Sequence, residues 1–130
     1  MAVTVLDASV VIGFLSSGDA HHSAAEAAFA RHREDELVIP ASVYADILVG
    51  PFRIGAAAAA KVESFLTDFS IRIAAVDAET AKRAAFLRSR HQSLRLPDAL
   101  VLATADAISA STVLTADRSW ARISSVTEVI

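Results

Sequence analysis

Short apolar runs rich in β-branched residues alternate along the chain with longer segments whose apolar residues recur at helical spacing. Runs of this kind are typical of buried strands, and the longer segments predict amphipathic helices. The predicted strands are residues 3–6, 37–40, 71–76, 112–114 and 126–129. The predicted helices are residues 10–16, 21–33, 43–50, 54–69, 78–90, 97–108 and a short one at 117–120.

Polar residues and prolines stand where several of these helices should begin or end. Ser42 and Asp77 can each cap the helix that follows it, because a short side-chain oxygen accepts a free backbone N–H there. Pro97 suits the first turn of a helix. Gly50 and Pro51 together are expected to end the helix that follows Ser42. The residues that begin or end helices therefore stand at the ends of the segments that the apolar spacing predicts to be helical.

The regular alternation of strands and helices predicts an α/β fold with helices on both faces of the sheet. We expect three layers, α/β/α, around a mostly parallel central sheet of four or five strands, with right-handed crossovers. The length of 130 residues and the lack of a linker indicate one domain over residues 1–130.

Aspartates follow or open several of the predicted elements. Asp7 follows the first strand, Asp98 opens a helix after Pro97, and Asp117 follows the strand at 112–114. Ligands of open α/β sheets bind at the carboxyl ends of the strands, so these acids should share one edge. Gathering like charges there is unfavourable unless a cation compensates them. The pattern therefore predicts a site for a hard divalent metal, Mg²⁺ or Mn²⁺, which prefer oxygen ligands.

A fourth acid, Asp46, and two hydroxyl residues are weaker candidates for the same site. Asp46 lies inside an apolar helix. Aspartate has a low propensity for helix interiors, which suggests that Asp46 has a specific role there. Ser9 and Thr115 each stand two residues from an acid and can support the carboxylates or metal-bound water. Other roles remain open: Ser9 can cap the helix at 10–16, Thr115 can make a strand-end hydrogen bond, and each acid can serve a turn or a helix start.

Composition restricts the remaining possibilities. The chain has no cysteine, no signal-peptide pattern and no apolar stretch long enough to cross a membrane, which favours a cytoplasmic protein. The net charge of −3 argues against coating nucleic acid by bulk electrostatics. Residues 81–97, however, hold five basic side chains and no acid. Arg88, Arg90 and Arg95 are therefore candidates to contact RNA, although a solvated helix face would look the same.

Four segments that carry these acids, in this order, resemble the PIN-domain family. They are Val-Leu-Asp-Ala-Ser at 5–9, Pro-Ala-Ser-Val-Tyr-Ala-Asp at 40–46, Leu-Pro-Asp-Ala-Leu-Val at 96–101 and Val-Leu-Thr-Ala-Asp at 113–117. The resemblance covers nearly the whole chain, and the length is similar to that of VapC-type ribonuclease toxins. It implies a PIN-like α/β/α fold.

The resemblance also implies an activity, a cofactor and partners. The chain would be a Mg²⁺- or Mn²⁺-dependent endoribonuclease, the toxin of a VapBC-type pair, which cleaves tRNA or rRNA at structured loops. Asp7, Asp98 and Asp117 would bind metal, Asp46 would complete the catalytic set, and Ser9 and Thr115 would support it. A VapB-like antitoxin and a homodimer are expected. The departure is Asp46, where the family usually has glutamate, whose side chain is longer by about 1.5 Å.

Two other functions compete with this interpretation. An aspartyl-phosphate phosphatase or receiver domain also has an aspartate after its first strand, but Asp7-Ala-Ser9 lacks the second acid of the phosphatase motif, and neither Lys61 nor Lys82 follows a strand. A non-catalytic binding module, acting through an antitoxin and DNA, would explain the shorter Asp46. It would not explain why a full set of unfavourable acids is present.

Overall fold

Five short strands form one sheet in which every neighbouring pair is parallel. The computed structural model describes residues 1–130, and its strands are β1 (Val3–Leu6), β2 (Glu36–Pro40), β3 (Arg72–Ala74), β4 (Thr112–Thr115) and β5 (Thr127–Val129). Their order across the sheet is β3-β2-β1-β4-β5. The order reverses between β1 and β4, because the chain first adds strands on one side of β1 and then returns to the other side.

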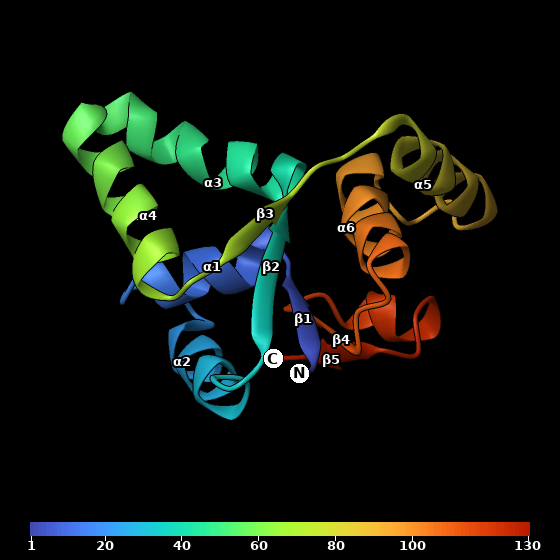
Figure 1. Ribbon diagram of the computed structural model, residues 1–130, viewed down its shortest axis with the longest axis horizontal. Coiled ribbons are helices and arrows are strands. Elements are labelled where there is room, and N and C mark those ends of the chain that lie inside the picture. Colours follow the sequence, from blue (N-terminus) through green and yellow to red (C-terminus); the bar gives the residue numbers. More distant parts are fainter.

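Helices cover both faces of this sheet, which confirms the expected α/β/α layers. They are α1 (Ala8–Leu15), α2 (His22–Arg31), α3 (Ala41–Ile54), α4 (Ala56–Asp68), α5 (Ala78–Arg90) and α6 (Leu96–Ala107), and a 3-10 turn, η1 (Arg118–Arg122), precedes β5. Figure 1 shows α1, α2 and α4 to one side of β1 and β2, and α5 and α6 to the other side. None of these helices combines the length and the apolar character that a membrane crossing requires.

The core lies where the central strands meet the helices. Val5, Val38, Val113 and Leu114 are fully buried, as expected for parallel strands covered on both faces. On the side of α1, α2 and α4 the rings of Phe14, Phe29, Phe65 and Phe69 form a cluster with centroids 4.4–6.0 Å apart. Tilted and edge-on rings at these distances add to the stabilisation that burial provides.

Helix α3 differs from its prediction at both ends. It continues through Pro51 to Ile54 instead of ending at Gly50. A proline there removes only one backbone hydrogen bond, whereas Gly55 has a φ of 155°, which glycine adopts readily, and so the chain turns at Gly55. Ser42 does not cap the helix, because Pro40 is the N-cap residue and the Ser42 hydroxyl is buried without a partner. Asp77 does cap α5, by accepting the Thr80 N–H.

A polar cluster joins the first strand, the end of α2 and the last strand. The His32 ring bonds Asp35 through Nδ1 at 2.7 Å and Glu128 through Nε2 at 2.9 Å. The buried Thr4 hydroxyl donates to Asp35 at 2.8 Å. Burial alone would lower the pKa of His32, but the hydrogen bonds to the two carboxylates outweigh it and raise the pKa. The hydrogen bond from His32 lowers the pKa of Asp35.

This cluster predicts a pH-dependent contribution to stability. Because the folded pKa of His32 is raised, its contribution is complete below its ordinary pKa of 6.5 and is lost as the pH rises through the raised value. We expect His32→Gln to lower the free energy of unfolding by about 1–2 kcal/mol near pH 6, and by much less at pH 9. Denaturant unfolding at the two pH values checks this, with exposed His21→Gln as the control. Equal losses for His32→Gln at both pH values would contradict it.

Candidate functional site

The four aspartates gather at the carboxyl edge of the sheet. Asp7 follows β1 and Asp117 follows β4, so the two lie on either side of the point where the strand order reverses. Asp98 is in the first turn of α6, and Asp46 is in the second turn of α3, the helix that follows β2 directly. Such a switch point is where α/β sheets bind ligands. The fold thus brings together acids that are 110 residues apart in the chain.

Asp7 is the most constrained of the four side chains. Its Oδ1 accepts the Ala8 N–H at 2.8 Å, which makes Asp7 the N-cap residue of α1. Its Oδ2 accepts the hydroxyls of Ser9 at 2.8 Å and Thr115 at 2.9 Å. Burial raises the pKa of Asp7, these hydrogen bonds oppose the rise, and the charge of Asp46 adds to it. The carboxylate is therefore held in one orientation beside another negative charge.

The two hydroxyls also connect Asp7 to the turn that carries Asp117. Ser9 Oγ accepts the Ala116 N–H, and Thr115 Oγ1 accepts the Asp117 N–H, both at 3.1 Å. Each hydroxyl thus accepts a backbone hydrogen and donates its own hydrogen to Asp7. Both hydroxyls thus contact the Asp7 carboxylate, and Thr115 also makes the strand-end hydrogen bond considered for it. Ser9 does not cap α1, because Asp7 itself occupies that position.

Asp98 is also partly buried, and its only ion pair is weak. Arg95 Nε lies 3.5 Å from Asp98 Oδ2, and the Arg95 side chain is mostly exposed. Burial raises the pKa of Asp98, Arg95 opposes the rise, and the charges of Asp7 and Asp117 reinforce it. Asp98 therefore interacts with both Asp7, which follows β1, and Asp117, which follows β4.

Asp117 is exposed and is oriented by its own turn. Its Oδ1 accepts the N–H of Ser119 at 2.9 Å and the Ser119 hydroxyl at 2.6 Å. The Ser119 hydroxyl lowers the pKa of Asp117 and burial opposes this, while the nearby indole N–H of Trp120 contributes to the lowering. That indole N–H is buried and makes no hydrogen bond of normal geometry.

Asp46 faces this group from the helix on the other side. Its side chain is exposed and has no hydrogen bond or ion pair, yet its charge raises the pKa of Asp7. Asp46 is therefore the one carboxylate of the four that no protein group holds in place. Its freedom is consistent with a role toward water or a substrate.

The donor set fits a magnesium-like ion. All four side chains offer only carboxylate oxygens. Burial, and to a smaller extent the charge of the neighbouring acids, raises the pKa of Asp7 and Asp98, and a bound cation would oppose both effects. As the side chains stand, no three of the chain's acidic and histidine residues lie close enough together to hold a metal ion between them. Mg²⁺ usually keeps several waters and binds through one or two carboxylates, so an open set of this kind suits it.

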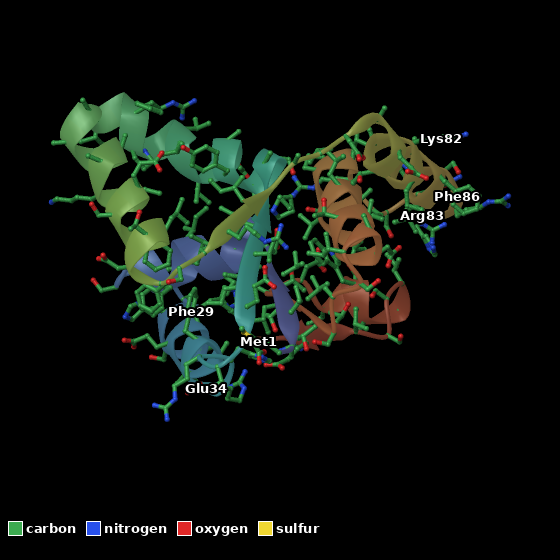
Figure 2. The ribbon with its side chains drawn as sticks, in the orientation of Figure 1. Met1, Phe29, Glu34, Lys82, Arg83 and Phe86 are labelled. Atoms are coloured by element: carbon green, nitrogen blue, oxygen red, sulfur yellow. The ribbon has the colours of Figure 1, made fainter.

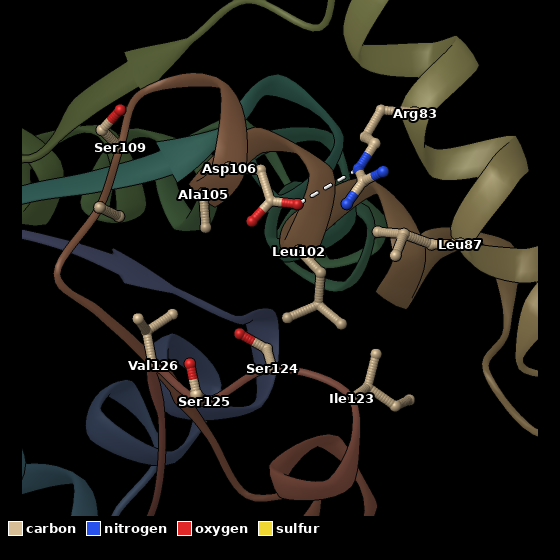
Figure 3. Close-up of a pocket in the computed structure, with 11 residues that line it drawn as sticks. Arg83, Leu87, Leu102, Ala105, Asp106, Ser109, Ile123, Ser124, Ser125 and Val126 are labelled. Carbon is tan, nitrogen blue, oxygen red and sulfur yellow. Dashed lines mark hydrogen bonds and ion pairs between the residues drawn. The ribbon is translucent and has the colours of Figure 1, made fainter.

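Three cavities of the molecule are lined by none of the four aspartates. Figure 3 shows one of about 330 Å³ between α5, α6 and the segment before β5, with the Arg83–Asp106 ion pair at its rim. Val126 and Ser109 also line it, so it is at the opposite edge of the sheet from the aspartates. We assign the candidate site to the aspartates. Their carboxylates interact electrostatically and Asp7 accepts two hydroxyl hydrogen bonds, whereas the residues that line the cavity form no comparable cluster.

The three arginines proposed for RNA occupy different places. Arg95 is at the mouth of the acidic site beside Asp98. Arg90 stacks over the Phe86 ring on α5, and Arg88 is exposed on a different flank of the same helix. The sequence prediction overlooked Ser119. Its signal was available, because Asp-x-Ser occurs at both 7–9 and 117–119, and in each case the serine hydroxyl donates to the aspartate.

Known proteins share the fold of this chain. A model of the PIN domain matches residues 4–126. The fold is similar to that of a VapBC complex from Rickettsia felis bound to promoter DNA (TM-score 0.80, 17% identity, 98% of each chain covered). It is also similar to a sarcin–ricin loop cleaving VapC toxin from Mycobacterium tuberculosis (0.76, 18%, 92% of this chain and 94% of that one). A toxin–antitoxin complex from Klebsiella pneumoniae has a TM-score of 0.76 at 22% identity, covering 97% of this chain and 96% of that one. A search of curated proteins found no match.

The hydroxyl contacts predict that Thr115 matters for more than packing. Thr115→Val keeps the branched shape but leaves the Asp117 N–H without its acceptor and removes a donor from Asp7. We expect the free energy of unfolding to fall by about 1–3 kcal/mol, as measured by denaturant titration. Thr112→Val, in the same strand but without a side-chain hydrogen bond, is the control. A Thr115→Val protein as stable as Thr112→Val would show that these contacts are unimportant.

Proposed function

Because the chain belongs to the PIN-domain family, we propose that it is a metal-dependent endoribonuclease and the toxin of a VapBC-type toxin–antitoxin pair. The observation that carries the proposal is the set of Asp7, Asp98 and Asp117 on one edge of the sheet, where burial and mutual repulsion disfavour charge on Asp7 and Asp98. Buried acids that repel one another are costly to retain unless a cation uses them.

In this proposal Asp7, Asp98 and Asp117 hold Mg²⁺ or Mn²⁺. A bound ion of this kind lowers the pKa of water and stabilises the charge that develops on phosphodiester oxygens. Ser9 and Thr115 keep the Asp7 carboxylate aimed at the ion, and Ser119 does the same for Asp117. Preorganised ligands of this type need little rearrangement during the reaction.

Asp46 has a separate role in this scheme. It is exposed and free of other contacts, so it can accept a proton from the attacking water or hold that water through one hydrogen bond. Arg95, at the mouth of the site, has a mostly exposed side chain and only a 3.5 Å contact with Asp98, so it would be available to contact the RNA phosphate next to the cleaved bond. The substrate is RNA, and tRNA or rRNA loops are the expected targets.

A cognate VapB-like antitoxin and a second copy of the chain are the proposed protein partners. Similar folds occur in toxin–antitoxin complexes. The C-terminal half of α3 exposes Val49, Phe52 and Ile54, the last at 83%, and an apolar surface of this kind suits a partner. Tyr44 differs from these three residues, because it is partly buried and its hydroxyl donates to Glu63 of α4. Such a toxin would act on RNA in the cytoplasm.

Two observations favour a second candidate, a binding module without catalysis. Asp46 replaces the longer glutamate, and the acids do not close around an ion. In that case the chain would still bind its antitoxin and would not cleave RNA in any metal. Activity of the wild-type protein therefore separates the two candidates.

Asp98 provides the sharpest mutational test of the ribonuclease. Asp98→Asn removes the charge but keeps the shape, so we expect cleavage of total RNA in Mg²⁺ or Mn²⁺ to be abolished while the fold is retained. Calorimetric titration should also show weaker Mn²⁺ binding. Asp106→Asn, an exposed change on the same helix, is the matched control and should cleave normally. Unchanged cleavage by Asp98→Asn would remove Asp98 from the site.

Substitution of Asp46 tests how its length affects activity. If it serves the attacking water, Asp46→Glu should preserve or raise the cleavage rate and Asp46→Asn should lower it strongly, with both measured under single-turnover conditions. A large loss in Asp46→Glu with an intact fold would show that the site is adapted to the shorter side chain. Equal rates in all three proteins would exclude Asp46 from the chemistry.

A further inference from the structure

An exposed aromatic ring lies between two arginines on the outer face of α5. The guanidinium carbon of Arg83 is 5.4 Å from the centroid of the Phe86 ring, and that of Arg90 is 5.1 Å from it. Three and four residues separate them from Phe86, so all three share one face of the helix. Figure 2 shows Phe86 with Arg83 and Lys82 at the outer edge of the molecule, far from the sheet.

Phe86 does not belong to the core. Helix α5 packs inward through Thr80, Ala84 and Leu87, all of which are buried, whereas 47% of Phe86 is exposed. A half-exposed phenylalanine gains less from burial than a core ring does, and two cations lie against it. The arrangement holds two guanidinium groups beside an accessible ring face or edge.

Basic side chains predominate around the ring. The segment 81–97 contains five of the chain's twelve basic residues and none of its fifteen acids. Arg90 has no acidic partner, and Arg83 has only Asp106, through a contact of 3.4 Å between half-exposed side chains. Within a chain of net charge −3, the basic side chains are thus concentrated where the exposed ring lies.

We propose that this surface, formed by Lys82, Arg83, Phe86 and Arg90, is a docking site for single-stranded RNA outside the acidic site. A base would stack on Phe86, and the basic side chains would contact the adjoining phosphates. Proteins bind single strands through aromatic platforms flanked by positive charge in this way. The inference rests on the proposed ribonuclease function and adds a second contact for the same substrate.

The path of the chain connects the docking surface to the acids. Helix α5 ends at Arg90, and a short loop leads to Arg95, the N-cap residue of α6, which contacts Asp98. From Lys82 to Arg90 the helix rises about 12 Å. An RNA strand that lies along α5 therefore passes from Phe86 over Arg90 and Arg95 to the acidic site without meeting an acid before Asp98.

The flank of α5 that carries Arg88 supplies a matched control. Arg88 is two residues from Phe86 and from Arg90, so it points well away from them around the helix. Arg88→Gln and Arg90→Gln remove the same charge from the same helix, but only the second alters the docking surface. Two arginines that the sequence could not distinguish are thereby given different roles.

Equilibrium binding in chelator tests the proposal without any cleavage. We would measure the anisotropy of a labelled mixed-sequence single-stranded RNA with the full-length wild-type protein and with Phe86→Ala, Phe86→Trp, Arg90→Gln and Arg88→Gln. Phe86→Ala should weaken binding roughly 10-fold, and Phe86→Trp should restore it. Arg90→Gln should weaken binding and reduce the slope of log Kd against log salt by about 0.7, whereas Arg88→Gln should change neither.

Several outcomes would overturn the docking site. These are wild-type protein that does not bind the RNA, Phe86→Ala binding as tightly as wild type, or Arg88→Gln weakening binding as much as Arg90→Gln. Polyglutamate binding that depends equally on Phe86 would reassign the surface to an acidic protein partner. Binding that depends on Phe86 in a protein without metal-dependent cleavage would uphold the docking site and refute only the ribonuclease.

Discussion

The site depends on the hydrogen bonds that hold the Asp7 carboxylate. Three donors fix it, namely the Ala8 N–H and the hydroxyls of Ser9 and Thr115, and the same two hydroxyls accept N–H groups from the turn that contains Asp117. A single carboxylate therefore starts α1, joins the ends of β1 and β4 and orients the second acid. Each hydroxyl has one hydrogen, which it donates to Asp7. Its oxygen at the same time accepts a backbone N–H from the turn. Asp7 therefore contributes both to the fold and to the proposed metal site.

Electrostatics gives the four acids different properties. Burial raises the pKa of Asp7 and Asp98, whereas hydrogen bonds from Ser119 lower the pKa of exposed Asp117. The first two acids would gain most from a cation, and the third is charged without one. No basic residue of α5 forms an ion pair with the four aspartates, so the charges proposed to bind the ion and those proposed to bind RNA do not neutralise each other. Only Arg95 stands between the two regions, where its mostly exposed side chain can serve either.

The parallel sheet and the edge that carries the acids could be predicted from the sequence. Contacts between residues far apart in the chain could not. Strand runs that end in Asp7 and Asp117, and Pro97 beside Asp98, indicated both the parallel sheet and the edge where the acids meet, because element ends are marked locally. The hydrogen bond from Thr115 to Asp7 joins residues 108 positions apart, and it follows only from the pairing of β1 with β4. The end of α3 was placed too early because Pro51 was expected to end the helix, whereas the helix continues through it to Ile54. The stacking of Arg90, and not Arg88, on Phe86 required the helix face to be known.

The most direct test of the proposed function is a cleavage assay with total cellular RNA. The purified protein, free of antitoxin, would be incubated with the RNA in Mg²⁺ or Mn²⁺ and in chelator, alongside Asp7→Asn. We expect discrete fragments that require both the metal and Asp7, and the sequences of their ends would identify the target. Fragments that form equally in chelator, or equally with Asp7→Asn, would contradict the proposal that these aspartates hold a catalytic ion.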